Sequence, residues 1–149
     1  MKYFLVFVIN AFIVTSAYAE DATIQPSELL FQEGETANLN EFLWIKRPIV
    51  VFADNPADPR FIQQMTLLQA RPQDLIDRDV VVLTDTNPAA KSDLRRKLRP
   101  RGFMLALLAK DGTVFLRKPS PWDIRELSRS IDKLPLRKQE LKDRRLPVE

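Results

Sequence analysis

Two short apolar runs, separated by one helical pattern, constrain the fold of this chain more than any other feature. Residues 49–53 and 79–84 consist mainly of aliphatic and aromatic side chains, without the alternation of a half-exposed strand. Strands of this kind are covered on both faces, as in a parallel sheet between layers of helices. Two parallel neighbours require a right-handed crossover connection, so the two runs predict an α/β domain.

The segment between the two runs begins like a helix N-terminus. Asp58 stands before Pro59, and an N-cap aspartate followed by proline at the first helical position is a common pairing. Phe61, Met65 and Leu68 follow at spacings i, i+4 and i+7, which place them on one face of a helix. We therefore expect a helix that begins after Asp58 and covers the sheet with this face.

The next part of the chain predicts a second helix and a hairpin. Residues 89–98 have a helical pattern, and residues 103–109 and 113–117 are apolar runs joined by a turn that contains Asp111 and Gly112. An Asp-Gly pair between two apolar runs is a strong signal for a β-hairpin. We expect two antiparallel strands here.

The last predicted helix begins with Ser120 as N-cap, Pro121 at the first helical position and Asp123 at the third, which is a near capping box. Its expected buried stripe consists of Ile124, Leu127, Ile131 and Leu134. Residues 40–44 indicate a short capped helix before the first strand. The order β-α-β-α-β-β-α, a mixed central sheet with helices on both faces, is the minimal order of an α/β thioredoxin-like fold.

The first nineteen residues have the pattern of an export signal. Lys2 gives a positive start, residues 3–14 are apolar except for Asn10, and residues 17–19 have the small-x-small pattern read by signal peptidase. The apolar run is short for a membrane span, and polar sequence follows it directly. We expect cleavage before Glu20 and a periplasmic or secreted protein without an integral membrane segment; an uncleaved anchor is the alternative.

The remaining chain suits a single domain. Removal of residues 1–19 from 149 leaves 130 residues, a length that supports one hydrophobic core. We expect an irregular N-terminal segment over residues 20–40 with weak extended character around Ile24 and residues 29–31, a thioredoxin-like domain over residues 41–136, and a charged C-terminal tail, helical or frayed, over residues 137–149.

The composition excludes most familiar catalytic chemistry. The chain has no cysteine and no histidine, and both tyrosines, Tyr3 and Tyr18, lie in the expected signal segment. Thiol redox chemistry, the Ser–His–Asp triad and Cys/His zinc sites are therefore excluded. Lys2 is the only charged residue of that segment, so 22 basic and 20 acidic residues follow it. This balance does not predict a nucleic-acid partner, and the sequence predicts no cofactor.

Four motifs resemble those of a bacterial family, the domain of unknown function 4174 family. The segments are W-I-K-R-P and the strand after it at residues 44–53, R-D-V-V-V at 78–82, L-L-A-K-D-G at 107–112 and I-D-K-L-P-L-R at 131–137. The match spans residues 41–142. The resemblance implies a thioredoxin- or peroxiredoxin-like fold, export, and relatedness to domains of animal extracellular DRO/URB and sushi-repeat proteins. It implies no catalytic residue.

One edge of the predicted sheet collects charged residues. Asp54 and Asp58 follow the first strand, Asp85 follows the second, Arg60 lies in the first helix and Arg101 precedes the third strand. In a thioredoxin-like sheet these positions share one edge, where open α/β sheets usually bind ligands. The alternative is structural: Asp58 caps a helix, Asp85 starts a turn and Arg101 pairs with Asp54.

A second candidate surface is the basic segment before the third strand. It contains Lys91, Arg95, Arg96, Lys97, Arg99 and Arg101. Asp93 can pair with Arg96 and Lys97, and Leu94 and Leu98 suffice to dock the helix on the sheet. The segment is either a solvated helix face or a surface for an anionic protein or lipid partner.

Trp44 and Trp122 are the two tryptophans of the chain. Each stands near the start of an expected element. We expect both to cover the core, because large apolar rings at such positions usually pack.

Three function classes are compatible with these residues. The first is a non-catalytic binding or interaction module on a cysteine-free thioredoxin-like scaffold. The second is a carboxylate-dependent enzyme or divalent-metal-binding protein that uses Asp54, Asp58 and Asp85. The third is a hydrolase with Ser120 activated by Lys118, which conflicts with Ser120 as a helix cap. We favour the binding module and expect no tightly bound metal.

Overall fold

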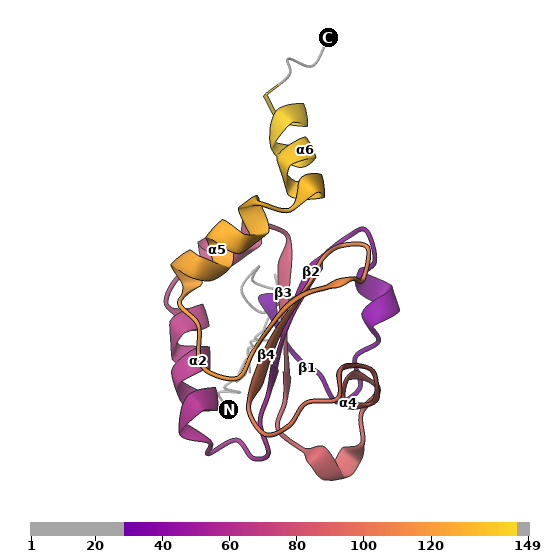
Figure 1. The fold of residues 1–149 in the computed structure, drawn as a ribbon, viewed down its shortest axis with the longest axis vertical. Coiled ribbons are helices and arrows are strands. Elements are labelled where there is room, and N and C mark those ends of the chain that lie inside the picture. Colours follow the sequence, from indigo (N-terminus) through magenta and orange to yellow (C-terminus); the bar gives the residue numbers. More distant parts are fainter. Residues whose placement is uncertain (1–28, 146–149) are drawn as a thin grey trace, which may run out of the picture.

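A computed structural model describes residues 29–145 of the chain, so the expected export signal lies outside the described residues (Figure 1). The strands are β1 (Phe31–Glu33), β2 (Arg47–Phe52), β3 (Val80–Asp85), β4 (Met104–Leu108) and β5 (Val114–Lys118). The α-helices are α2 (Pro59–Gln69), α3 (Pro72–Ile76), α4 (Asp93–Leu98), α5 (Ile124–Asp132) and α6 (Pro135–Asp143). Two 3₁₀ helices are η1 (Leu39–Phe42) and η2 (Pro88–Ala90). Within residues 29–145, none of the helices has the length and apolarity needed to span a bilayer.

The five strands form one mixed sheet in the order β1-β3-β2-β4-β5. The strand β2 runs parallel to β3, with Ile49 opposite Val82, and antiparallel to β4, with Ile49 opposite Leu107. The hairpin of β4 and β5 turns at Gly112, whose φ of 85° suits glycine. These pairings and the helices on both faces confirm the expected fold class.

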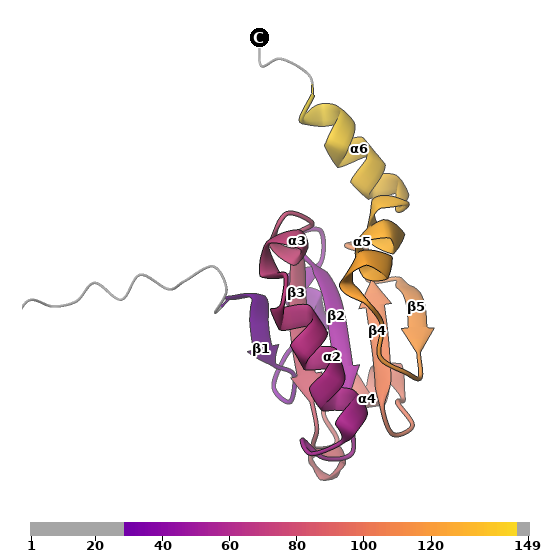
Figure 2. The ribbon, with the colours of Figure 1, turned by 90° about the vertical axis from the view of Figure 1, so that its left-hand side faces the viewer.

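The sheet separates two apolar cores. In β2, Ile49 and Val51 face one core while Val50 and Phe52 face the other, because alternate residues of a strand point to opposite faces. Figure 1 shows α2 and α5 on one side of the sheet and α4 on the other, and Figure 2 shows α2, α3 and α5 together in front of the strands. The expected stripe of α5 is buried in the first of these cores.

The N-terminal expectations need two corrections. Within the segment expected to be irregular, Phe31–Glu33 forms β1 and pairs in parallel with β3. The short helix expected over residues 40–44 is η1, which begins one residue earlier and is capped by Asn38, whose side chain accepts from the Asn40 amide at 3.0 Å. The helix α3 was not expected; it is a five-residue element without a clear apolar period.

The helix expected over residues 89–98 is divided. The 3₁₀ helix η2 ends at Lys91, which adopts a left-handed conformation with φ 48°. Ser92 then serves as N-cap of α4, and its hydroxyl accepts from the Arg95 amide at 3.2 Å. A left-handed residue cannot continue a right-handed helix, so the capping serine starts a new one.

The last helices also differ from expectation. The N-cap of α5 is Asp123, not Ser120, and its side chain accepts from the Arg125 amide at 2.6 Å. The buried Gln64 of α2 holds the preceding backbone: the Trp122 amide donates to Gln64 at 2.7 Å, and Gln64 donates to the Trp122 carbonyl at 3.0 Å. Both the amide and the carbonyl of Trp122 are thereby hydrogen-bonded to α2, so α5 begins after this residue.

The charged C-terminal segment, for which the sequence leaves a helix or a frayed end open, forms α6. This helix begins at Pro135, and Arg137 in its first turn is buried. Both views show α6 extending away from the sheet (Figures 1 and 2). The folded domain therefore continues beyond residue 136.

Candidate functional site

Asp58 and Arg60 form a compact pair at the start of α2. The Asp58 carboxylate accepts from the Arg60 amide at 2.9 Å and pairs with the Arg60 guanidinium at 3.0 Å. The hydrogen bond from the Arg60 side chain is the main cause that lowers the pKa of Asp58 below its ordinary value. The expected cap is confirmed.

Asp54 lies close to Arg60 across Gly102. A Cβ atom added at Gly102, whose φ is 61°, would lie 3.9 Å from both the Asp54 carboxylate and the Arg60 guanidinium. Arg60 also lies over the Phe103 ring at 5.6 Å from its centroid. Asp54 and Arg101, both exposed, form no ion pair among residues 29–145, so this part of the structural alternative is not found there.

Asp85 belongs to a separate, buried arrangement. Its carboxylate accepts from the Ser92 hydroxyl, from Arg95 at 2.8 Å and from the Asn87 amide at 3.1 Å. The oxygens of Asp85 are thus occupied by protein donors. Over the described part of the chain, no three carboxylates gather in a geometry that could hold a metal ion. The structure therefore joins Asp54, Asp58 and Arg60 but not Asp85.

Arg95 corrects the expected partner surface. Its side chain is only 10% exposed, and besides its ion pair with Asp85 it donates to the Ala53 carbonyl at 2.7 Å. The guanidinium also lies 5.4 Å from the centroid of the Phe52 ring. Arg95 therefore fixes α4 to the ends of β2 and β3 and is not available to a partner.

The other cations of this segment remain at the surface. Arg96 forms the expected ion pair with Asp93, and both are exposed. Lys91, Lys97 and Arg99 are exposed as well. Leu94 and Leu98 are buried, as expected for the residues that dock the helix.

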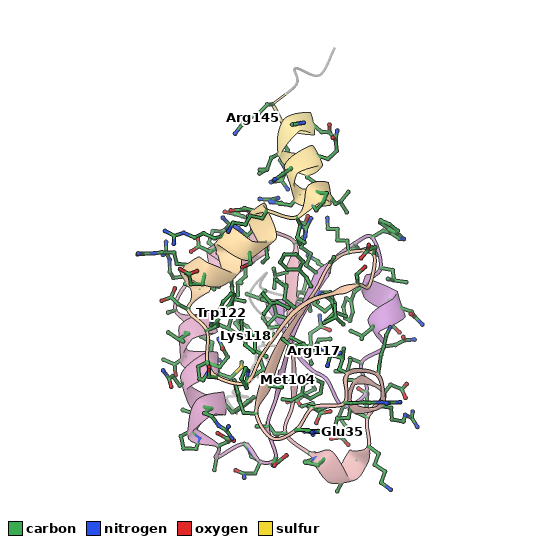
Figure 3. The ribbon with its side chains drawn as sticks, in the orientation of Figure 1. Glu35, Met104, Arg117, Lys118, Trp122 and Arg145 are labelled. Carbon is green, nitrogen blue, oxygen red and sulfur yellow. The ribbon has the colours of Figure 1, made fainter. Side chains whose placement is uncertain are left out.

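A cationic pocket opens where α4 ends and the hairpin returns. Its volume is about 320 Å³, and no carboxylate lines it. The lining residues are Arg99, Arg101, Phe103, Met104, Arg117, Lys118 and Pro119. Figure 3 shows Met104, Arg117 and Lys118 grouped near the lower part of the hairpin.

Local contacts hold the side chains of the cationic pocket. Arg117 donates to the Leu98 carbonyl at the end of α4 and to the Met104 sulfur at 3.9 Å. The Lys118 ammonium lies 4.3 Å from the centroid of the Trp122 ring (Figure 3). Trp122 is partly buried against the core, as expected. Arg117 therefore lies against the end of α4 and Lys118 against Trp122, and both side chains line the pocket together with Phe103 and Met104.

Sequence reasoning found only half of the cationic pocket. Arg99 and Arg101 belong to the basic segment that was recognised, whereas Arg117 and Lys118 stand in a strand sixteen or more residues later. The antiparallel register of β4 and β5, in which Leu105 lies opposite Lys118, brings them beside the start of β4. The available signal in the sequence was the pair of consecutive cations, Arg117 and Lys118, at the end of a strand.

The contacts of Lys118 do not support the hydrolase hypothesis. Within the described residues Lys118 packs on Trp122, and no hydrogen bond joins it to Ser120.

The opposite end of the sheet holds an ion-pair network that sequence reasoning missed. It joins Arg47, Arg78, Asp79, Lys110, Asp132, Arg137 and Glu140. Glu140 is its centre, because it accepts from Arg47 at 2.9 Å, Lys110 at 2.8 Å and Arg137 at 3.3 Å. Burial raises the pKa of Glu140, but hydrogen bonds from Arg47 and Lys110 outweigh it and lower the pKa to about 2.

This network explains the four sequence motifs. Arg47, Asp79, Lys110 and Asp132 each come from a different motif, and the network brings them together. Trp44 of the first motif does not cover the core as expected: it is 68% exposed, with a left-handed φ of 65°. The motifs therefore encode one end of the domain.

The fold and the absence of cysteine define a thioredoxin-like domain without a redox pair. The chain belongs to the family described as a domain of unknown function (DUF4174), which matches residues 38–140. No curated protein matches this sequence.

Several solved structures have a similar fold. Reduced 2-Cys peroxiredoxin from Plasmodium vivax superposes with a TM-score of 0.54 at 12% identity, over 72% of this chain and 85% of that one. Chloroplastic thioredoxin z gives a TM-score of 0.52 at 20% identity, over 70% and 92%. Desulfothioredoxin from Desulfovibrio vulgaris Hildenborough gives 0.52 at 17%, over 70% and 97%. At these identities the similarity extends to the fold alone.

Proposed function

We propose that this chain is an exported, non-catalytic binding module that holds an anionic ligand in the cationic pocket. The observation that carries this proposal is the convergence of Arg99, Arg101, Arg117 and Lys118 on one cavity without a carboxylate. Its volume is within the range of small-molecule sites. A phosphorylated or polycarboxylate small molecule has the required charge.

The guanidinium groups specify the kind of anion. Arginine presents a planar fork of donors that matches phosphate and carboxylate oxygens in pairs. No ion pair inside the described residues occupies Arg99 or Arg101, so their donors are available. Phe103, Met104 and Pro119 line the pocket beside the cations and add apolar contacts for a ligand.

One further observation supports binding rather than catalysis, and another supports export. The chain lacks thiol and imidazole groups, and at the junction after β2 the Asp58 carboxylate is already paired with Arg60. The signal-like pattern of residues 1–19 supports a periplasmic or secreted location. The carboxylate-dependent alternative needs Asp85, whose oxygens are bound by Ser92 and Arg95.

The test compares two pairs of substitutions by isothermal titration with pyrophosphate, citrate and inorganic phosphate. The variant Arg99→Gln/Arg101→Gln removes two pocket cations. The control Lys91→Gln/Arg125→Gln removes two exposed cations outside it, and Lys91 is left-handed like Arg99.

We expect wild type and control to bind at least one of the polyanions, and the pocket variant to bind it at least about tenfold more weakly, because a charge-assisted hydrogen bond contributes about 1.5–3 kcal/mol. Absence of binding to wild type, or equal loss in both variants, overturns the proposal. Stronger binding of citrate than of pyrophosphate would indicate that the ligand is a polycarboxylate and not a phosphorylated molecule.

A further inference from the structure

Three large apolar side chains are exposed near the ion-pair network, at the end of the sheet opposite the cationic pocket. Trp44 is 68% exposed, Ile45 62% and Leu136 39%. Trp44 and Leu136 line the same pocket of about 170 Å³, with Leu134 and Pro135 beside them. We call Trp44, Ile45 and Leu136 the apolar patch. Ile45 follows Trp44 in the chain, and exposed apolar side chains that lie together mark interaction surfaces.

Backbone hydrogen bonding and the helix α6 hold the residues of the apolar patch in place. The Trp44 amide donates to the Lys110 carbonyl at 2.7 Å, so the left-handed turn at Trp44 is tied to the β4–β5 hairpin. Leu136 lies in the first turn of α6, next to Arg137 of the ion-pair network. The patch is therefore presented in a defined geometry that keeps Trp44 at the surface.

Positive charge adjoins the apolar patch along α6. Residues 133–145 carry six basic and two acidic side chains, and one of the acidic ones, Glu140, is already bound in the ion-pair network. The exposed cations of this segment are Lys133, Lys138, Lys142, Arg144 and Arg145. They form no ion pair within residues 29–145. Figure 3 shows Arg145 at the far end of α6, so the charge extends along that helix.

The carboxylates at this end are fewer than the cations. Asp111 lines the same pocket as Trp44, and its carboxylate keeps its negative charge while it accepts from the Thr113 amide at 2.9 Å and from the Thr113 hydroxyl at 2.5 Å. Asp143 accepts from Gln139 at 2.8 Å. The surface therefore combines an exposed indole, two aliphatic side chains and an excess of flexible cations.

We propose that this end of the domain docks on an anionic lipid bilayer. In this arrangement Trp44, Ile45 and Leu136 enter the interfacial layer, where tryptophan is favoured. The lysines and arginines of α6 then contact lipid phosphates. Long, exposed lysine and arginine side chains suit a fluid layer of anionic headgroups better than the directional contacts of a protein interface.

The experiment uses sedimentation with vesicles of phosphatidylglycerol or of phosphatidylcholine. Trp44→Ser/Leu136→Ser removes two members of the apolar patch. Ile62→Ser/Phe115→Ser is the matched control, because these residues are 53% and 45% exposed on α2 and β5. Circular dichroism checks that all three proteins are folded. All three proteins begin at Glu20, the expected mature N-terminus, so the apolar residues 1–19 do not contribute to vesicle binding.

We expect wild type and control to bind phosphatidylglycerol vesicles and the patch variant to bind at least tenfold more weakly. All three proteins should bind phosphatidylcholine vesicles more weakly than wild type binds phosphatidylglycerol vesicles. In a Trp122→Phe background, Trp44 is the single tryptophan and its emission should shift to the blue on phosphatidylglycerol.

Equal binding by wild type and the patch variant, or an unchanged Trp44 emission, overturns the proposal. So does a wild-type dimer in sedimentation velocity that Trp44→Ser dissociates while vesicle affinity stays the same, because the patch would then join two copies of the chain.

Discussion

Arg95 and Arg96 are neighbours in α4, yet their side chains have opposite environments. Arg95 is enclosed by Asp85, the Ala53 carbonyl and the Phe52 ring, whereas Arg96 pairs with Asp93 in solvent. A buried ion pair leaves an uncompensated charge when one partner is removed, and an exposed pair contributes little. Charge in the sequence does not distinguish the two cases, so both arginines were expected at the surface.

The first prediction follows from this difference. Arg95→Gln should lower the free energy of unfolding by about 3 kcal/mol or more, because it leaves the Asp85 carboxylate buried without its cation. Arg96→Gln should change it by less than about 0.5 kcal/mol. Urea denaturation followed by circular dichroism measures both. Equal effects would show that the Arg95–Asp85 pair does not hold α4 in place.

The second prediction concerns Glu140 and pH. Its pKa is about 2 in the folded protein and about 4.5 as the ordinary value. The unfolded chain therefore binds the proton more readily, so the stabilisation is fully present above about pH 4.5 and is lost as the pH falls toward 2. We expect Glu140→Gln to reduce stability by about 2–3 kcal/mol at pH 7.

Urea titrations of wild type and Glu140→Gln at several pH values between 7 and 2 check this prediction. The difference in unfolding free energy between the two proteins should shrink steadily below about pH 4.5. A difference that is the same at every pH would mean that Glu140 acts by packing and not through its charge.

At the scale of the elements, local sequence patterns predict most helices and strands correctly but predict some of their ends at the wrong residue. The Asp58–Pro59 pair and the Asp111–Gly112 turn act through neighbouring backbone, and both are where the sequence predicts them. The start of α5 depends instead on Gln64, which lies in another helix and holds the Trp122 backbone. A capping box at Ser120 could not reveal this contact.

The third prediction distinguishes the two possible starts of α5. Asp123→Ala should lower the free energy of unfolding by about 1 kcal/mol, because it removes the acceptor for the Arg125 amide. Ser120→Ala should leave stability nearly unchanged, since the described contacts of α5 do not include its hydroxyl. Thermal unfolding of both variants gives the comparison. A larger loss in Ser120→Ala would restore the earlier helix start.

At the scale of the whole molecule, the sequence predicts the sheet better than the contacts at its two ends. The apolar runs and the hairpin determine β2 to β5 through local pattern, and the topology follows from them. The cationic pocket and the ion-pair network depend on contacts between distant segments, such as Arg47 with Glu140. Residue types alone do not indicate which charges will meet.

The fourth prediction concerns the entire chain. Thiol–disulfide exchange and thiol peroxidase chemistry both require a thiolate, and the chain has no cysteine. Purified protein should therefore neither reduce insulin disulfides in the presence of dithiothreitol faster than buffer does, nor consume hydrogen peroxide. Turnover that scales with protein concentration and survives repurification would contradict the assignment of this fold to a non-redox role.

The contact between Arg47 and Glu140 also has a consequence for the time course of synthesis. The two residues are 93 positions apart, so the ribosome completes β2 long before it makes α6. Until then Arg47, which is buried, lacks the carboxylate that pairs with it, and closing the core around it would bury an unbalanced charge. We therefore expect the domain to fold stably only when α6 is present.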